Sequence, residues 1–343
     1  MTQTRFADSG PSLEYAPRTT LSDFGTVADP AAGGYLLGQI NYTTAAADPT
    51  VSGTGSPVLD LHMTADPGDA FSELWITRDP VHSGTHDGVV FAHDGEYLLC
   101  AGRVPQARTY AAATEHAYLA ALNVMRDLGY RHCYRMWNFV NQINAPNAEG
   151  LETYRDFCLG RANAFEKTGF GEDVMPAATG IGSLGGGIGF YFLSGRSARP
   201  TMIENPEQMS AYHYPRRYGP KAPKFARAAH LATAGSGHVY VSGTASITGH
   251  KTRYAGDIVR QTHVSLQNIA RVIGATNLWE HGIPDGHFLS NLDHVKVYVR
   301  HAEHIPVVRQ ICTRAFSTAA EIRYLNVDIC RSDLLVEIEG IAY

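Results

Sequence analysis

Several features of common protein classes are missing from this 343-residue sequence. No apolar run approaches the ~18 residues that a membrane-spanning helix requires, and the N-terminus lacks the apolar segment of a signal peptide. No block of lysine and arginine occurs, and 33 acidic residues against 28 basic ones give a net charge of −5. These absences predict a protein that binds neither nucleic acid nor membrane.

Metal-binding and disulfide patterns are also scarce. The sequence contains no H-E-x-x-H and no paired C-x-x-C, so the histidine pairs His301/His304 and His281/His287 are better interpreted as ordinary histidines than as metal ligands. The five cysteines are scattered and odd in number. This usage favours a reduced, cytoplasmic protein over a disulfide framework.

One motif resembles a nucleotide-binding loop. The stretch GIGSLGG contains the spacing G-x-G-x-x-G at Gly180, Gly182 and Gly185. A dinucleotide site needs a helix directly after the glycines, but the following GIGFYFLSG is typical of a strand. We therefore interpret the motif as a glycine-rich strand that another backbone or a ligand approaches closely.

What the sequence does contain is enough apolar material for a core, with 44% hydrophobic residues. Residues 1–30 are polar without a lasting period, which predicts a flexible N-terminus. Short apolar runs separated by glycine, proline, aspartate and serine follow, and they predict strands. These runs are 34–42, 58–63, 73–77 and 97–104.

A helix–strand–helix order then occurs twice. The first copy is predicted at 114–129, 134–143 and 150–165, and the second at 253–274, 295–300 and 305–316. The two strands begin roughly 160 residues apart, a period too long for a solenoid. The pattern predicts an α+β protein of two fused units, 31–198 and 199–343, each a sheet with two helices on one face.

The most informative stretch is NVDICRSDLLVEIEG, residues 326–340, which is typical of strand, turn and strand. Glu337 and Glu339 flank Ile338 in the second strand, so both carboxylates point to the same face of the sheet. This face is either the solvent-exposed side of an antiparallel sheet or a rigid support for a general acid.

The predicted helix 150–165 carries a second candidate group. Tyr154 and Arg161 are seven residues apart and share a helix face. Arg161 also shares its stripe with apolar Phe157 and Phe165, so its guanidinium is either solvated or directed into a cleft that supplies an anionic partner.

A loop rich in tyrosine, proline and arginine spans residues 204–228. Its composition is typical of a surface loop. The side chains of Tyr214, Tyr218 and Arg227 are equally suited to a site for an aromatic or cyclic anion.

Taken together, six stretches resemble the chorismatases of actinomycete secondary metabolism. They are TYRDFCLGRA, MPAATGIGSLGGGI, IENPEQMSAYHYPRRYGP, SGTASITGHKT, HVKVYVR and DICRSDLLVEIEG. The resemblance runs from about residue 30 to the C-terminus, and the end of the last stretch is also similar to small Rid/YjgF proteins. It implies a fold of two fused Rid/YjgF-like (chorismate mutase-like) units, in agreement with the repeat.

The resemblance implies a cofactor-free enzyme that acts on chorismate, a cyclic dianion with an enolpyruvyl ether. Glu337 matches the catalytic glutamate of the family, which protonates the enolpyruvyl methylene, and Glu339 is expected to be structural. Five further residues are expected to bind the substrate, the arginines through its carboxylates and the tyrosines as hydrogen-bond donors. They are Tyr154, Arg161, Tyr214, Arg227 and, as a reserve candidate, Arg300.

Gly243 and Cys330 bear on the product. Where hydrolytic chorismatases carry alanines, this sequence has the glycine and cysteine of the 3-hydroxybenzoate-forming group, which implies 3-hydroxybenzoate and pyruvate as products. A four-residue turn at 331–334 would place Cys330 opposite Leu335, on the face of Glu337, and a three-residue turn would reverse this. A small buried apolar residue is the alternative interpretation of Cys330.

Three alternatives remain open from the sequence. The first is a hydrolase that releases 3,4-dihydroxycyclohexa-1,5-diene carboxylate and pyruvate. The second is a Rid-type imine deaminase, although Tyr324, beside Arg323, aligns where that family has an arginine. The third is a non-catalytic module that binds small anions. Because two fused units can form a site within one chain, we expect a monomer.

Overall fold

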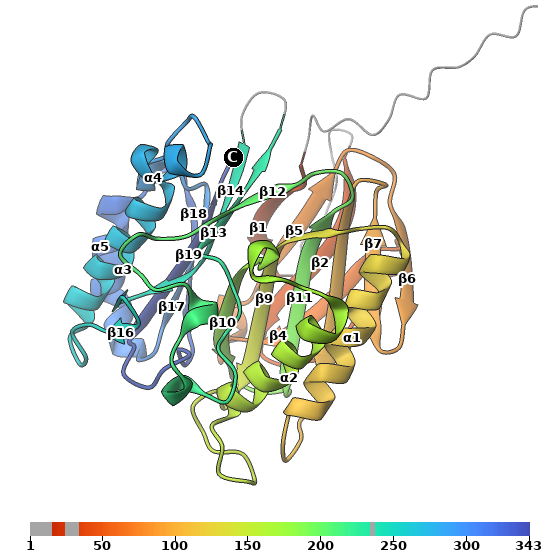
Figure 1. The fold of residues 1–343 in the computed structure, drawn as a ribbon, viewed down its shortest axis with the longest axis horizontal. Helices are drawn as coiled ribbons and strands as arrows, with labels where there is room; N and C mark the ends of the chain where they lie inside the picture. The colour runs from red at the N-terminus through yellow and green to blue at the C-terminus, as the bar shows by residue number, and fades with distance from the viewer. Residues whose placement is uncertain (1–15, 25–33, 234–236) are drawn as a thin grey trace, which may run out of the picture.

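The protein is described here by a computed structural model that covers residues 16–24, 34–233 and 237–343. Its strands form three large sheets and one two-stranded ribbon within these residues (Figure 1). The first sheet has the order β1-β5-β2-β4-β3, and the described residues between its strands contain no α-helix. Its strands are β1 (Arg18–Asp23), β2 (Tyr35–Thr43), β3 (Thr50–Val51), β4 (Pro57–His62) and β5 (Phe71–Thr77).

The second sheet has the order β10-β9-β11-β8-β7-β6, and two helices cover one face of it. These are α1 (Ala111–Asp127), between β8 and β9, and α2 (Thr153–Thr168), between β9 and β10. The strands are β6 (His82–His86), β7 (Val89–His93), β8 (Tyr97–Val104), β9 (His132–Asn141), β10 (Ala177–Ser183) and β11 (Ile188–Gly195).

The third sheet has the order β12-β13-β14-β19-β17-β18. Its helices are α3 (Ile258–Ile273), the short α4 (Ala275–Glu280) and α5 (Ile305–Ala315). The strands are β12 (Pro200–Ile203), β13 (Ala228–Ala232), β14 (Gly237–Ala245), β17 (His294–Val299), β18 (Glu321–Asn326) and β19 (Val336–Ala342); β15 (Ile247–Thr248) and β16 (Lys251–Thr252) form the ribbon.

The two helix-bearing sheets have the same topology. In each sheet, the first three strands in sequence lie side by side. A helix then leads to a fourth strand, and a second helix leads to a fifth strand that pairs with the fourth in parallel. The sixth strand inserts between the third and the fourth. The inserted strand, β11 or β19, is antiparallel to both of its neighbours. This correspondence confirms the predicted α+β duplication.

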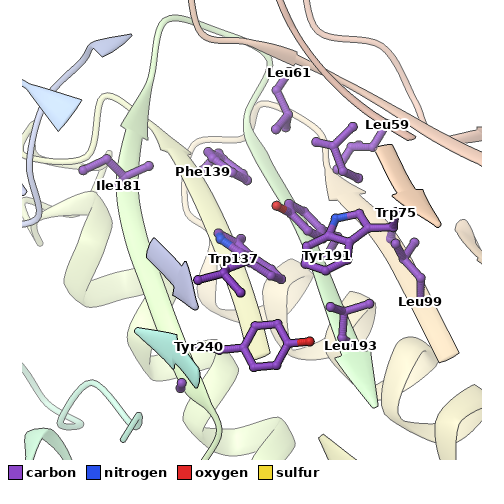
Figure 2. Packing of buried hydrophobic residues seen from close by; sticks show 14 of the residues in the cluster. Leu59, Leu61, Trp75, Leu99, Trp137, Phe139, Ile181, Tyr191, Leu193 and Tyr240 are labelled. Atoms are coloured by element: carbon purple, nitrogen blue, oxygen red, sulfur yellow. The ribbon is translucent and has the colours of Figure 1, made fainter. Parts of the chain in front are cut away.

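Strand alternation divides the interior into three cores. Even-numbered residues of β19, such as Ile338, pack beneath α3 and α5, whereas odd-numbered Ile341 joins the central core. In β11, Phe192 packs beneath α1 and α2, and Tyr191 faces the centre. The central core receives side chains from all three sheets (Figure 2), including Trp75, Trp137, Tyr191 and Tyr240. The two helix-free sheet faces and the first sheet therefore meet at the centre of the molecule.

Two features differ from the predicted domain organisation. β1 lies within the segment 1–30 that was expected to be flexible, but it pairs with β5 from Arg18 to Asp23, so that prediction is wrong for this strand. Residues 1–15 and 25–30 lie outside the described residues. The predicted unit 31–198 also contains two sheets, because β2 to β5 belong to the first sheet. The predicted boundary at 198/199 falls between β11 and β12, strands of different sheets, and it stays a prediction.

Candidate active site

A cavity of about 470 Å³ lies where the two helix-bearing units meet. The units join there through β10 and β14: Ala178 N–H donates to Ser242 Oγ at 2.9 Å, and Ser242 Oγ–H donates to the carbonyl of Ala226 at 2.6 Å. The walls come from α2, β10, the loop before β13, β14, β19 and the segment before β19. The predicted site residues among the lining are Tyr154, Arg161, Tyr214, Arg227, Gly243, Cys330 and Glu337.

Glu337 reaches the cavity from β19, on the face turned away from α3 and α5. Its side chain is nearly inaccessible, with 3% exposure. Burial and the negative charge of Glu339 raise the pKa of Glu337 from 4.5 to about 8, because both disfavour a second carboxylate there. Within the described part of the chain it hydrogen bonds only to the Cys330 thiol, 3.7 Å from Oε2. Glu337 is therefore a neutral acid at pH 7.

Gly243 lies against this acid. The pairing of β14 with β19 shifts between Val241 and Thr244, so Gly243 sits in a β-bulge opposite Glu339. A Cβ atom at position 243 would lie 2.0 Å from Glu337 Oε1. Only glycine leaves the carboxyl group its observed place, so alanine here would force it to move.

Two buried guanidinium groups face the same cavity. Arg161 is 2% exposed and forms no ion pair with any described residue; its guanidinium lies 5.1 Å from the ring centre of Phe157. Arg227 is 3% exposed and donates to Met209 O at 2.8 Å and to Tyr214 Oη at 2.9 Å. Glu204 lies 4.0 Å from Arg227, but Arg161 has no such anion. Buried arginine is rarely left without an anion, so the cavity beside Arg161 marks a place for one.

The phenols of the site are held near these cations. The Tyr154 ring packs against Gly180 of β10, and burial keeps the pKa of its hydroxyl well above 10. Tyr214 accepts a hydrogen bond from Arg227, which leaves its hydroxyl hydrogen free to donate. Both hydroxyl groups can therefore donate hydrogen bonds into the cavity.

Cys330 lines the cavity, but the turn that was predicted to place it there is wrong. β18 and β19 do not pair with each other, since β17 lies between them, and Cys330 belongs to an irregular segment rather than to a strand opposite Leu335. Burial and the neighbouring Glu337 raise the pKa of the Cys330 thiol well above 9. The residue is thus a weak hydrogen-bond donor and not a thiolate nucleophile.

Arg300, the reserve candidate for carboxylate binding, does not line the cavity, and that expectation is wrong. Its guanidinium forms an ion pair with Asp328 and donates to the carbonyls of Leu334, Ile329 and Arg331. These contacts all go to the segment that carries Cys330. Arg300 therefore fixes the shape of this segment instead of binding a ligand.

Glu339 lies beside Glu337 on the strand but has a different environment. Its carboxylate pairs with Lys296 at 3.0 Å and with Arg135 at 2.6 Å, and it accepts from Trp137 Nε1 at 2.9 Å. Burial alone would raise its pKa, but the Lys296 and Arg135 cations outweigh burial and lower the pKa to about 2. Glu339 is therefore ionised and turned toward the central core, as the expected structural role requires.

Sequence reasoning missed several residues around the site. Arg331 stacks its guanidinium 4.1 Å from the ring centre of Tyr218 and donates to His250 O at 2.9 Å, so it ties the segment before β19 to the opposite wall. Thr179 accepts hydrogen bonds from Gly243 N and Arg135 and also binds Glu339. Both residues lie in stretches that carry the family resemblance, but nothing in those stretches indicates their contacts, and only the packing of β10 on β14 brings Thr179 here.

The glycine motif has the structural role that was predicted. Gly180 and Gly182 lie inside β10, and Gly182 N–H donates to Asp328 O at 2.8 Å. A Cβ atom on Gly182 would lie 2.7 Å from that same carbonyl oxygen. The glycines therefore allow the backbone of the segment before β19 to approach β10.

Neither residue at the Rid-type arginine position lies in the cavity. Tyr324 of β18 packs under α5, with the Arg309 guanidinium 4.2 Å from its ring centre, and Arg323 pairs with Asp23 at 3.5 Å. Among residues 16–24, 34–233 and 237–343, no group of histidine, cysteine, aspartate and glutamate is arranged to hold a metal ion. No helix of the described chain is long and apolar enough to cross a membrane.

The fold and site define a two-unit α+β protein in which a neutral buried acid and two guanidinium groups face one cavity. Comparisons with known proteins agree with this description. The family model "Chorismatase FkbO/Hyg5-like, N-terminal" matches residues 73–194. A 3-hydroxybenzoate synthase from Streptomyces hygroscopicus is 51% identical over 91% of this chain and 93% of its own length.

A chorismatase from Streptomyces rapamycinicus is 46% identical over 89% of this chain and 92% of its own length. The crystal structure of a chorismatase superposes with a TM-score of 0.92 at 42% identity and covers 96% of this chain and 98% of that one. The chain belongs to the chorismatase family.

Proposed function

We propose that this protein converts chorismate to 3-hydroxybenzoate and pyruvate. One observation carries the proposal: a protonated carboxyl group, Glu337, shares a buried cavity with the guanidinium groups of Arg161 and Arg227. The 3-hydroxybenzoate synthase at 51% identity supports the product. The site needs no metal or organic cofactor for this reaction, because protonation and internal displacement are its only steps.

Substrate binding follows from charge. Chorismate brings two carboxylates into a protein of net charge −5, so local cations must offset that repulsion. Arg161 and Arg227 can each hold one carboxylate through paired N–H donors. Tyr154 and Tyr214 add uncharged donors that introduce no further charge into the cavity.

Glu337 then acts on the enolpyruvyl ether. Its proton passes to the terminal methylene carbon, which becomes a methyl group, and the ether carbon becomes an oxocarbenium ion. Carbon accepts protons slowly, so the acid must be fixed and held protonated at neutral pH, as Glu337 is.

The ring hydroxyl next to the ether ends the reaction. Its oxygen displaces the side chain at the neighbouring ring carbon, its proton passes to the Glu337 carboxylate, and the C–O bond breaks toward the pyruvate oxygen. The resulting arene oxide opens, and the C–H proton lost from the ring is replaced by one on the phenol oxygen, so that no net proton is gained or lost. Every atom of chorismate is thereby shared between 3-hydroxybenzoate and pyruvate, and no water is added.

Incubation with chorismate followed by chromatography tests the proposal. We expect pyruvate and 3-hydroxybenzoate in equal amounts. A dihydroxycyclohexadiene carboxylate in place of the phenol would indicate the hydrolase, and binding without pyruvate release would indicate an anion-binding module. Ammonia release from an imino acid would instead identify a Rid-type deaminase.

We expect Gly243 and Cys330 to set the product together. A methyl group at position 243 would press on Glu337 Oε1, while the Cys330 thiol already lies 3.7 Å from the other carboxyl oxygen, Oε2. Gly243→Ala alone should therefore slow pyruvate release by about 10²-fold, since a catalytic group misplaced by about 1 Å costs this much.

The double variant Gly243→Ala/Cys330→Ala should recover pyruvate release, because the shortened side chain makes room for the displaced carboxyl. Its main ring product should be the dihydroxy diene, because water gains access to the oxocarbenium ion. Pyruvate and both ring products are quantified for the wild type, each single variant and the double variant. An unchanged product ratio in the double variant would refute the assignment.

We further propose that the protein acts as a monomer in the cytoplasm. Both helix-bearing units contribute walls to the cavity, which supports a site formed within one chain. The five cysteines lie in the described part of the chain as free thiols, and a reducing compartment would preserve Cys330 in the site. Sedimentation at catalytic concentrations tests the monomer.

A further inference from the structure

Four charged side chains form a chain of ion pairs between the three sheets, outside the cavity. Glu73 comes from β5, Arg135 from β9, Lys296 from β17 and Glu339 from β19. Lys296 Nζ lies 2.7 Å from Glu73 Oε2 and 3.0 Å from Glu339 Oε1, and Arg135 pairs with Glu339 at 2.6 Å. All four are buried. Two cations and two anions leave the network neutral as a whole.

Buried ion networks are not in themselves favourable, because desolvation offsets much of the attraction. The proposed reaction supplies a reason for this one. Glu339 is two residues from Glu337 on the same inward face of β19, so its carboxylate is a fixed negative charge next to the proposed acid.

We propose that Glu339 is a positioning residue that keeps Glu337 protonated, and that Lys296 and Arg135 keep Glu339 ionised for this purpose. The proposal rests on the acid role assigned to Glu337. The cations form their ion pairs with Glu339 and not with Glu337, so the pull of Arg135 on the proton of the acid is smaller than the opposing effect of Glu339.

The other groups around Glu337 cannot replace this effect. Burial raises the pKa of Glu337 most and ionised Glu339 raises it further, whereas the Cys330 hydrogen bond and the Arg135 and Arg227 cations lower it. Cys330 and Tyr154 are neutral at pH 7. The titratable and charged groups that face Glu337 from the packed elements are Tyr154, Arg161, Arg135, Arg227, Tyr298, Cys330 and Glu339.

The test compares two glutamines in the same network. Glu339→Gln removes the charge next to Glu337 and leaves Arg135 without its carboxylate, so Glu337 should ionise at lower pH. Glu73→Gln also removes a buried carboxylate from Lys296, but from β5 on the opposite sheet. It is the matched control, because it disturbs the network without changing the neighbour of Glu337.

Two readouts separate this inference from the proposed function. The first is the pH dependence of kcat/KM with chorismate. In Glu339→Gln the alkaline limb of this profile should move to lower pH by about one unit. The variant should therefore lose about tenfold in kcat/KM above pH 8.5 and almost nothing at pH 6. The second is a direct ¹³C NMR titration of the Glu337 carboxyl group, which needs no turnover. Both should remain at the wild-type position in Glu73→Gln.

The outcomes are distinct. An unchanged Glu337 titration in Glu339→Gln, or an equal change in Glu73→Gln, would overturn the inference even if chorismate is the substrate. Failure to turn over chorismate, with the NMR titration shifted as expected, would overturn the proposed function alone. Should Glu339→Gln not fold, the wild-type spectrum still decides: a Glu339 carboxyl that is protonated at pH 6 contradicts the inference.

Discussion

Replacement of Glu337 by glutamine is expected to reduce chorismate turnover by about 10²–10⁴-fold, the usual contribution of a general acid. Glutamine keeps the shape of the side chain but has no transferable proton. Chorismate should still bind, since Arg161 and Arg227 remain in place. Pyruvate release under saturating chorismate, together with calorimetric affinity, measures both effects. Full activity in the folded variant would remove Glu337 from the mechanism.

The stability of Glu337→Gln provides a control, because the direction in which it should differ from the wild type at each pH is known. The folded protein raises the pKa of Glu337 from 4.5 to about 8, so folding must bind a proton between these values. This contribution to stability is complete below pH 4.5 and is lost as the pH rises toward 8. Glutamine carries no such dependence, and Glu337→Gln should therefore be as stable as the wild type at about pH 4 and more stable at pH 8.

Replacement of Arg161 by alanine is expected to weaken chorismate binding by about 2–5 kcal/mol, as for one partner of a desolvated charge pair. The effect should exceed that of Arg227→Ala. Arg161 has no ion-pair partner among the described residues and is free to bind a ligand, whereas Arg227 lies 4.0 Å from Glu204 and already donates to Tyr214. Each alanine variant is best measured in the Glu337→Gln background, where calorimetry records chorismate affinity without turnover.

Arg155 supplies the matched control for Arg161. It lies on the same helix, lines the same cavity and carries the same charge, but it is partly exposed and pairs with Glu152 at 3.6 Å. Solvent screens such pairs, so Arg155→Ala should cost much less. Equal losses in the two variants would mean that general charge, rather than a buried guanidinium, holds the substrate.

The sequence predicted those parts of the site that depend on local periodicity. Alternation along a strand placed Glu337 and Glu339 on one face, and helical spacing placed Tyr154 and Arg161 together, and the structure shows both arrangements. The repeated helix–strand–helix order predicted the duplication, because each copy preserves its own pattern of apolar residues.

Contacts between segments that are distant in the sequence could not be predicted in this way. Cys330 was placed by assuming that consecutive strands form a hairpin, but the duplicated topology inserts β17 between β18 and β19. Arg300 was a candidate cation for binding a carboxylate. Only the folded structure shows that its guanidinium donates hydrogen bonds to backbone carbonyl groups. The partners of Glu339 come from strands up to 204 residues away, so no local pattern could indicate them.

The repeated topology has a consequence for how the two copies have diverged. The inserted strand of the first copy, IGFYFLSG, carries no acidic residue, whereas its counterpart β19 carries two. The first copy instead contributes α2 and β10 as walls for the second. The two copies thus differ in content: the second carries the buried acid Glu337, and the first supplies walls around it. Neither half contains the whole site, so the effect of a substitution in either half can be measured by assaying the same reaction.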